Sequence, residues 1–112
     1  MKILKEILLI IIFISSYGSS QTYKNVRAIQ DGLSITVQYD MNGRLFRNDQ
    51  VALTYSIDDG KNYSIALDAE GDIGSDVLPG KNNEINWLLI DKDFIIGKII
   101  NFRIITLPEG MA

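Results

Sequence analysis

Six acidic side chains in the middle of the chain are the residues best suited by type and spacing to do chemistry. Oxygen-rich loops can hold Ca²⁺, and a pair of carboxylates such as Asp58 and Asp72 could hydrolyse a glycosidic bond if a sugar cleft held them at a defined separation. The sequence contains no D-x-D-x-D-G loop with a Glu at its twelfth position, and it defines no such cleft. We therefore interpret the group as solvated turn carboxylates and keep calcium binding as an alternative. Its members are Asp58, Asp59, Asp68, Glu70, Asp72 and Asp76.

Histidine and cysteine are both absent from the 112 residues. The commonest transition-metal ligands and the usual pairs of base and nucleophile are therefore missing, and secretion would leave no disulfide to form. We assign no catalytic, cofactor-binding or metal-binding residue. We expect a protein that is not an enzyme and that needs no cofactor.

Four aromatic residues point to a different kind of site, a platform on which a sugar could stack. Each of them is in phase with the apolar positions of its expected strand. We therefore predict that they pack in the core, where large apolar side chains usually lie. These residues are Trp87, Tyr63, Tyr55 and Tyr39.

The elements that must position these residues are β-strands, because apolar and polar residues alternate almost everywhere beyond the N-terminal segment. The clearest case is residues 33–39, where Leu33, Ile35, Val37 and Tyr39 alternate with polar side chains. This pattern is typical of a half-buried antiparallel strand. The expected strands cover residues 22–29, 33–39, 51–57, 63–67, 85–89 and 98–106.

Turn signals separate these strands. Asp31-Gly32 predicts a tight hairpin, residues 40–43, 58–60 and 79–83 have turn-forming composition, and residues 91–97 could form one short helical turn. We predict an all-β, antiparallel β-sandwich of the immunoglobulin/fibronectin-like type. About six strands are expected where such folds have seven or more. A last strand is therefore expected to be lacking, either because the sandwich is a short variant or because the chain is a fragment.

The final expected strand, residues 99–106, would then lie at an unpaired edge of its sheet. Such edges pair readily with other chains. We therefore expect the isolated chain to dimerise or aggregate.

The N-terminal segment has the organisation of a secretory signal peptide. Lys2 and Lys5 supply a positive region, residues 7–14 are apolar, and small residues follow. The apolar run is shorter than the ~20 residues that span a bilayer, so we favour a cleaved signal over a membrane anchor. We expect cleavage before Gln21, or alternatively before Ser19. The mature protein would be secreted or periplasmic (extracytoplasmic), without membrane contact.

The mature chain would be mildly acidic. Cleavage would remove two lysines and one glutamate, so the net charge would change from −3 to −4. This charge argues against nucleic acid or an anionic membrane as a partner. The remaining residues suffice for a small core.

The turn after residues 51–57 resembles the Asp-box, S-x-D-x-G-x-T-W, of sialidase-like hairpins. Ser56, Asp58 and Gly60 match that pattern, whereas Asn62 stands in place of Thr and Tyr63 in place of Trp. In such a turn the Asp carboxylate caps backbone N–H groups and the glycine supplies positive φ. The resemblance implies a structural turn, away from any catalytic centre.

A longer stretch, about residues 26–106, resembles an immunoglobulin-like or fibronectin type III-like module of secreted Bacteroidetes-type proteins. The most specific parts are G-D-I-G at 71–74 and V-L-P-G-K-N-N-E-I-N-W at 77–87, although Leu88 stands where an Asp commonly follows the Trp. In that family the module often precedes a formylglycine-generating-enzyme-like (sulfatase-modifying) domain. P-E-G-M-A at 108–112 resembles the opening of such a domain. No catalytic residue of that domain can be assigned here.

We therefore expect a signal peptide (1–20), a β-sandwich module (21–107) and a truncated linker (108–112). The expected function is that of a non-catalytic accessory or interaction module, the N-terminal part of a longer extracytoplasmic protein. Its partner would be a protein or glycan at the cell surface, or a downstream sulfatase-modifying-like domain. A carbohydrate-binding module of the cell surface is the alternative, and a small Ca²⁺-dependent or hydrolytic domain is the third hypothesis. Exposed coplanar rings would favour the carbohydrate-binding module, and converging carboxylates would favour the Ca²⁺-dependent or hydrolytic domain. Buried aromatics together with turn carboxylates would favour the accessory module.

Overall fold

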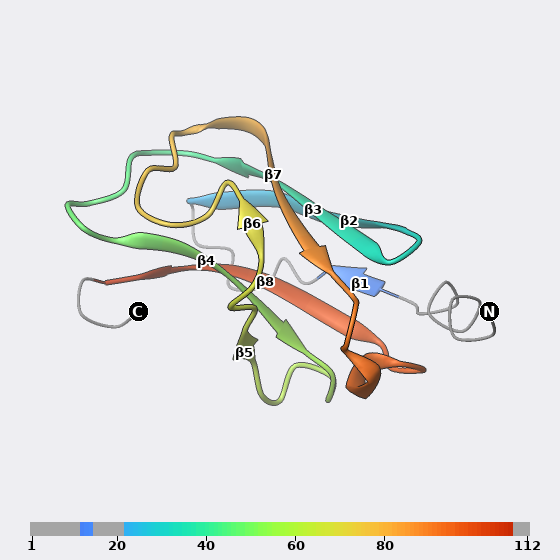
Figure 1. Ribbon diagram of the computed structural model, residues 1–112. Coiled ribbons are helices and arrows are strands. Elements are labelled where there is room, and N and C mark those ends of the chain that lie inside the picture. The colour runs from blue at the N-terminus through green and yellow to red at the C-terminus, as the bar shows by residue number, and fades with distance from the viewer. Residues whose placement is uncertain (1–11, 15–21, 109–112) are drawn as a thin grey trace.

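Two β-sheets lie face to face, and the described residues contain only one short helix (Figure 1). The computed structural model describes residues 12–14 and 22–108. The elements in chain order are β1 (Ile12–Ile14), β2 (Tyr23–Asp31), β3 (Ser34–Met41), β4 (Gln50–Ser56), β5 (Ser64–Ile65), β6 (Glu70–Gly71), β7 (Gly80–Leu88), the short 3₁₀ helix η1 (Asp93–Ile95) and β8 (Ile100–Leu107). The first sheet has the order β1-β8-β4-β5, and the second sheet has the order β2-β3-β7-β6.

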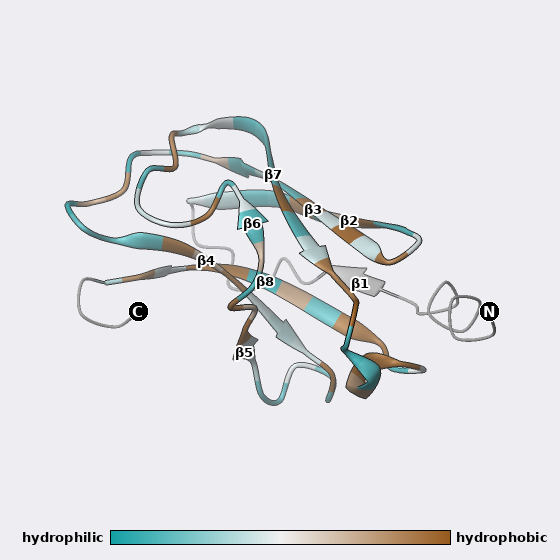
Figure 2. Cartoon of the chain, viewed as in Figure 1, coloured by the Kyte–Doolittle hydropathy of each residue, from teal (hydrophilic) through white to brown (hydrophobic). Residues whose placement is uncertain are grey.

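Strict alternation along β3 shows how the sequence builds the core. Ile35, Val37, Tyr39 and Met41 are buried, and the residues between them are half-buried. Because β3 pairs with β2 on one side and with β7 on the other, its backbone groups are satisfied and one face can be given to the interior. Figure 2 shows hydrophobic segments recurring along the central strands of both sheets.

Aromatic side chains join the two sheets inside this core. Trp87 of β7 lies between Tyr55 of β4 and Phe102 of β8, with ring centroids 4.8 and 5.9 Å away. Tilted and edge-on ring pairs are favourable beyond the area that they bury. The sandwich thus depends on contacts between segments far apart in the sequence, and the predicted all-β, antiparallel fold class is confirmed.

Tyr23 and Tyr39 form a second group of contacts, one of which links the two sheets. The hydroxyl groups of Tyr23 in β2 and Thr106 in β8 are hydrogen-bonded, which links the two sheets. Tyr23 meets Tyr39 edge-on at 5.8 Å, and the Tyr39 hydroxyl donates to the Asp72 carbonyl at 2.5 Å. Burial raises the pKa of Tyr39 to about 12, so this hydroxyl stays protonated and keeps its donor role.

β7 begins earlier than predicted, and this part of the sequence interpretation is wrong. A turn was expected at residues 79–83, but β7 starts at Gly80. Asp40 of β3 explains the difference, because its Oδ1 accepts the Asn82 backbone N–H at 3.0 Å and its Oδ2 accepts the Asn25 amide at 2.7 Å. The start of β7 is therefore held by polar contacts, which leave no apolar pattern in the sequence.

The region between β4 and β7 also departs from expectation. The strand predicted over 63–67 shrinks to β5, and Leu67, expected on the apolar face, is 88% exposed. Contact with β4 continues to Ala66, whose N–H donates to the Leu53 carbonyl at 2.9 Å. The chain then turns at residues 67 and 68, where the Ala69 N–H donates to the Ala66 carbonyl at 3.2 Å. β6 was not predicted, since Glu70 and Gly71 carry no apolar side chain. The helical turn expected within 91–97 is confirmed as η1.

The expected signal peptide, residues 1–20, lies outside the described residues except for β1. Ile12–Ile14 pair with Ile100–Phe102 of β8 in parallel. This places β1 at the edge of the first sheet, on the side of β8 that faces away from β4. Part of the predicted unpaired edge is therefore covered. Residues 109–112 of the expected linker also lie outside the described ranges. Within those ranges, no helix has the length and apolarity that crossing a bilayer requires.

Candidate interaction surface

The turn that follows β4 is built around the carboxylate of Asp58. Its Oδ1 accepts the Ser56 hydroxyl at 2.7 Å and the Asn62 backbone N–H at 2.9 Å, and its Oδ2 accepts the Asn62 amide at 2.8 Å. The Gly60 N–H donates to Ser56 Oγ at 2.9 Å. Asp59 and Gly60 have φ values of 64° and 82°, in the region that glycine adopts most easily. Both carboxylate oxygens of Asp58 thus already serve the turn.

These hydrogen bonds lower the pKa of Asp58 to about 2, and the Asn62 side chain is the largest cause. Because the folded-state pKa lies below the unfolded-state value, the stabilisation is complete above about pH 4 and is lost as the pH falls toward about 2. We expect the melting temperature of the natural chain to fall more over this interval than that of Asp58→Asn, which carries no charge. Circular dichroism melts at several pH values measure this difference. Parallel pH profiles for the two proteins would contradict the assigned role.

Asp68 connects the loop after β5 to the core tryptophan. Its Oδ1 accepts the Trp87 indole N–H at 2.9 Å, and its Oδ2 accepts the Lys92 ammonium at 2.5 Å. The Lys92 Nζ also lies 5.4 Å from the Trp87 ring centre, a favourable cation–π distance. The Lys92 hydrogen bond, above all, holds the pKa of Asp68 below its usual value. A buried indole N–H needs an acceptor, and Asp68 is that acceptor.

The structure does not bring the other acidic residues together. Asp72 Oδ2 accepts the Glu84 backbone N–H at 2.7 Å, so Asp72 is tied to the second sheet while Asp58 belongs to a turn of the first. The pair considered for glycoside hydrolysis is therefore split between the two sheets. Within the described ranges, no three His, Cys, Asp or Glu side chains lie close enough to hold a metal ion. The remaining candidate calcium ligands are exposed: Asp59, Glu70 and Asp76.

The four aromatic residues considered as a sugar platform do not form one. Trp87 and Tyr39 are 1% and 0% exposed, so their predicted core packing is confirmed, and Tyr55 packs against the same core. Tyr63 is an exception to the prediction. It lies beside the outer face of the first sheet, where the Arg103 guanidinium is 4.4 Å from its ring centre, a cation–π contact.

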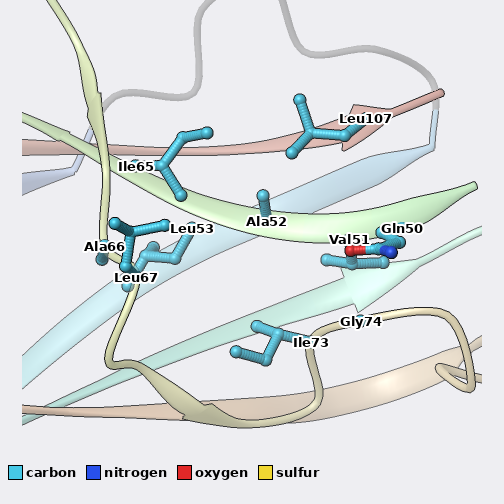
Figure 3. Close-up of a pocket in the computed structure, with 10 residues that line it drawn as sticks. All are labelled: Gln50, Val51, Ala52, Leu53, Ile65, Ala66, Leu67, Ile73, Gly74 and Leu107. Carbon is cyan, nitrogen blue, oxygen red and sulfur yellow. The ribbon is translucent and has the colours of Figure 1, made fainter. Parts of the chain in front are cut away.

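An apolar groove runs along β4 (Figure 3). Residues from four separate stretches of the chain line it, and Ile65, Leu67 and Ile73 lie beside the strand. Its volume is about 180 Å³, whereas ligand sites usually enclose about 300–1,000 Å³. Its small size and apolar lining suit one or two apolar side chains. Its lining consists of Gln50, Val51, Ala52, Leu53, Ile65, Ala66, Leu67, Ile73, Gly74 and Leu107.

Backbone hydrogen bonds hold one wall of this groove in place, whereas its rim is exposed to solvent. Val51 and Gly74 exchange two backbone hydrogen bonds of 2.9 Å, which fix the loop that carries Ile73 against β4. Leu67 and Ile65, in contrast, are solvent-exposed. Large apolar side chains exposed beside an apolar groove are typical of contact surfaces. No single segment carries this pattern, so the sequence did not predict it.

Comparison with known proteins identifies no relative of this chain. No protein-family model, no curated protein and no solved structure matches the chain. The residues and contacts described above therefore form the basis of the functional proposal.

Proposed function

We propose that this protein is a secreted, non-catalytic β-sandwich module that binds a macromolecular partner outside the cytoplasm. The observation that carries the proposal is that several of the residues considered for chemistry or for sugar stacking have partners within the fold. Asp58, Asp68 and Asp72 complete local hydrogen bonds, and Trp87 and Tyr39 lie in the core. The surface keeps the exposed carboxylates of Asp59, Glu70 and Asp76. It also offers apolar contact area, such as the rim of the groove along β4. Such a domain offers a binding surface rather than a reactive centre.

The order of the strands supports an immunoglobulin-like module. In such sandwiches strands A, B, E and D form one sheet, and C, F and G form the other, with C′ beside C in the variable type. Strands β2, β3, β7 and β6 have the order A, B, E, D, and strands β8, β4 and β5 have the order F, C, C′. The chain also visits these positions in the same succession. The Asp-box-like turn at 56–63 is a local feature of this module.

The extracytoplasmic location is proposed from the N-terminal pattern. A positive region, an apolar region over residues 7–14 and small residues before Gln21 are typical of a secretory signal. The partner in this setting is a protein or a glycan of the cell surface, or a neighbouring domain of sulfatase-modifying type. The carbohydrate-binding alternative has less support, because the platform that it needs is absent among the aromatic residues considered for it.

Export is tested by expressing the full chain in a Gram-negative host and sequencing the N-terminus of the product. The expected product is extracytoplasmic and begins at Gln21 or Ser19. A cytoplasmic or membrane-bound product that retains Met1 would overturn the proposed location.

Glycan binding is tested with the same protein on a glycan array. The proposal expects no sugar signal that depends on Tyr63. A sugar signal that Tyr63→Ala abolishes and Leu67→Ser leaves unchanged would replace the proposal with the carbohydrate-binding alternative. Leu67→Ser is a suitable control, since a highly exposed side chain can be changed with a cost usually below about 0.5 kcal/mol.

A further inference from the structure

The edge of β8 that faces away from β4 is covered over only part of its length. β1 pairs with Ile100–Phe102, and no strand of the described residues pairs with Arg103–Leu107 on that side. Between Ile100 and Leu107 the strand has no proline, no lysine and one charged residue, Arg103. Edges that lack such protection accept further strands readily.

The segment seated on this edge shows what the edge can hold. β1 runs parallel to β8, with Ile12 in register with Ile100, position 13 with Asn101, and position 14 with Phe102. β1 also lies near β2, so it stands where the edge strands of the two sheets approach one another (Figure 1). An extended segment from elsewhere in the chain therefore fits this position.

The direction of β1 distinguishes it from a strand that would continue the sandwich. A strand that followed β8 through a tight hairpin would run antiparallel to it, as G follows F in immunoglobulin-like domains. β1 occupies the place of G but runs parallel and comes from the opposite end of the chain. The edge of β8 at Ile100–Phe102 therefore holds a segment that is separate from the sandwich, and we call this position the slot.

We propose that removal of the leader vacates this slot, and that the β8 edge then receives an extended apolar segment of a partner polypeptide, paired parallel to β8. This mode of recognition adds a strand to an exposed sheet edge. The inference rests on the proposed cleavage after residue 20, because β1 belongs to that leader.

The slot also defines the chemistry of the partner segment. Ile100 and Phe102 are both 0% exposed and face the interior, whereas Asn101 is half-buried on the other face. Residues paired across neighbouring strands share a face of the sheet. The partner must therefore place large apolar side chains opposite Ile100 and Phe102, while the residue opposite Asn101 can be polar.

The test uses the full chain with its own β1 disabled. Ile12→Asp together with Ile14→Asp places charges at the two positions in register with Ile100 and Phe102, and Phe13→Asp is the matched control opposite Asn101. The probe is a synthetic peptide of residues 10–16 with lysines at both ends. Successive N–H groups of a strand point to opposite sides, so hydrogen exchange at those amides of Ile100–Phe102 that face away from β4 reports whether a strand is seated.

In the double variant we expect faster exchange at these amides than in the control, and roughly tenfold or greater slowing when the peptide is added. A peptide with Asp at positions 12 and 14 should bind roughly tenfold or more weakly, and one with Asp at position 13 within about threefold. No slowing by the natural peptide, or equal weakening by both changes, would overturn the proposal. A dimer of the double variant that the peptide does not dissociate would also overturn it, because a second copy would then be the occupant.

Cross-linking gives a second readout that avoids the aspartate variants. The chain has no cysteine, so Asn101→Cys introduces a single thiol. A peptide with Cys at position 13 should form a disulfide with it faster than a peptide with Cys at position 16, because only the first brings the thiols within bonding distance. Equal rates would contradict the register. These outcomes do not depend on cleavage in cells, which N-terminal sequencing decides separately.

Discussion

Trp87→Ala is expected to destabilise the domain by about 3–5 kcal/mol, a large part of the stability of a domain of this size. Trp87 is 1% exposed and touches rings of both β4 and β8 across the sandwich. Truncation leaves a cavity between two sheets whose backbones are fixed by strand pairing, so the space can close only in part. It also removes the donor to Asp68 and the ring beneath Lys92.

Urea unfolding of Trp87→Ala and Trp87→Phe measures this effect and divides it. Phenylalanine keeps an aromatic ring against Tyr55 and Phe102 but donates no hydrogen bond to Asp68. We expect it to cost about 1–3 kcal/mol, less than alanine. A loss below about 1 kcal/mol for the alanine variant would contradict the central place of Trp87 in the core.

Gly71→Ala is expected to disrupt the pairing of β6 with β7. A Cβ at position 71 would lie 2.5 Å from the Glu84 carbonyl oxygen and 3.3 Å from the Ile85 Cα. Both are backbone atoms of β7, so the clash is relieved only if the strands separate. The φ of 115° adds strain of its own, because side chains rarely adopt it. Together these effects should cost about 2–5 kcal/mol.

Gly74→Ala provides the control for this change. Gly74 has a φ of 93°, but a Cβ there would meet nothing within 4 Å. Its cost should come from backbone strain alone, about 1–3 kcal/mol. Urea denaturation of both variants isolates the clash as the difference between them. Equal losses would show that β6 does not approach β7 as closely as the structure has it.

The long strands could be predicted because their buried faces recur at every second residue. Along β3 the alternation from Ile35 to Met41 coincides with burial at each apolar position. The same reasoning correctly placed Trp87 and Tyr39 in the core. One buried face per strand is what an antiparallel sandwich requires, so the fold class follows from the pattern.

Segments whose backbone pairs without burying a side chain could not be recognised in this way. The first residues of β7 are polar and are held by Asp40, and β6 contains only Glu70 and Gly71. Leu67 shows the opposite failure, because an apolar residue in apparent phase is exposed once the chain turns after Ala66. Period alone does not report where a strand ends.

In the candidate site, too, contacts between near neighbours in the sequence could be predicted, whereas contacts between distant residues could not. The turn at Asp58 could be predicted because its partners Ser56 and Asn62 are close neighbours in the sequence. The bond from Trp87 to Asp68 spans 19 positions, and no spacing rule connects such residues. The groove along β4 and the pairing of β1 with β8 likewise arise only when distant segments meet.

The pKa of Asp58 in the folded chain tests most directly whether the acidic residues support the fold or bind a ligand. NMR of the side-chain carboxyl carbon of Asp58 measures this pKa. We predict a pKa of about 2 that stays the same when Ca²⁺ is added, because the turn already occupies both oxygens. A pKa near the ordinary 3.8, or a change in the carboxyl signal that saturates with Ca²⁺, would contradict this role. Either result would return the acidic residues to consideration as a binding site.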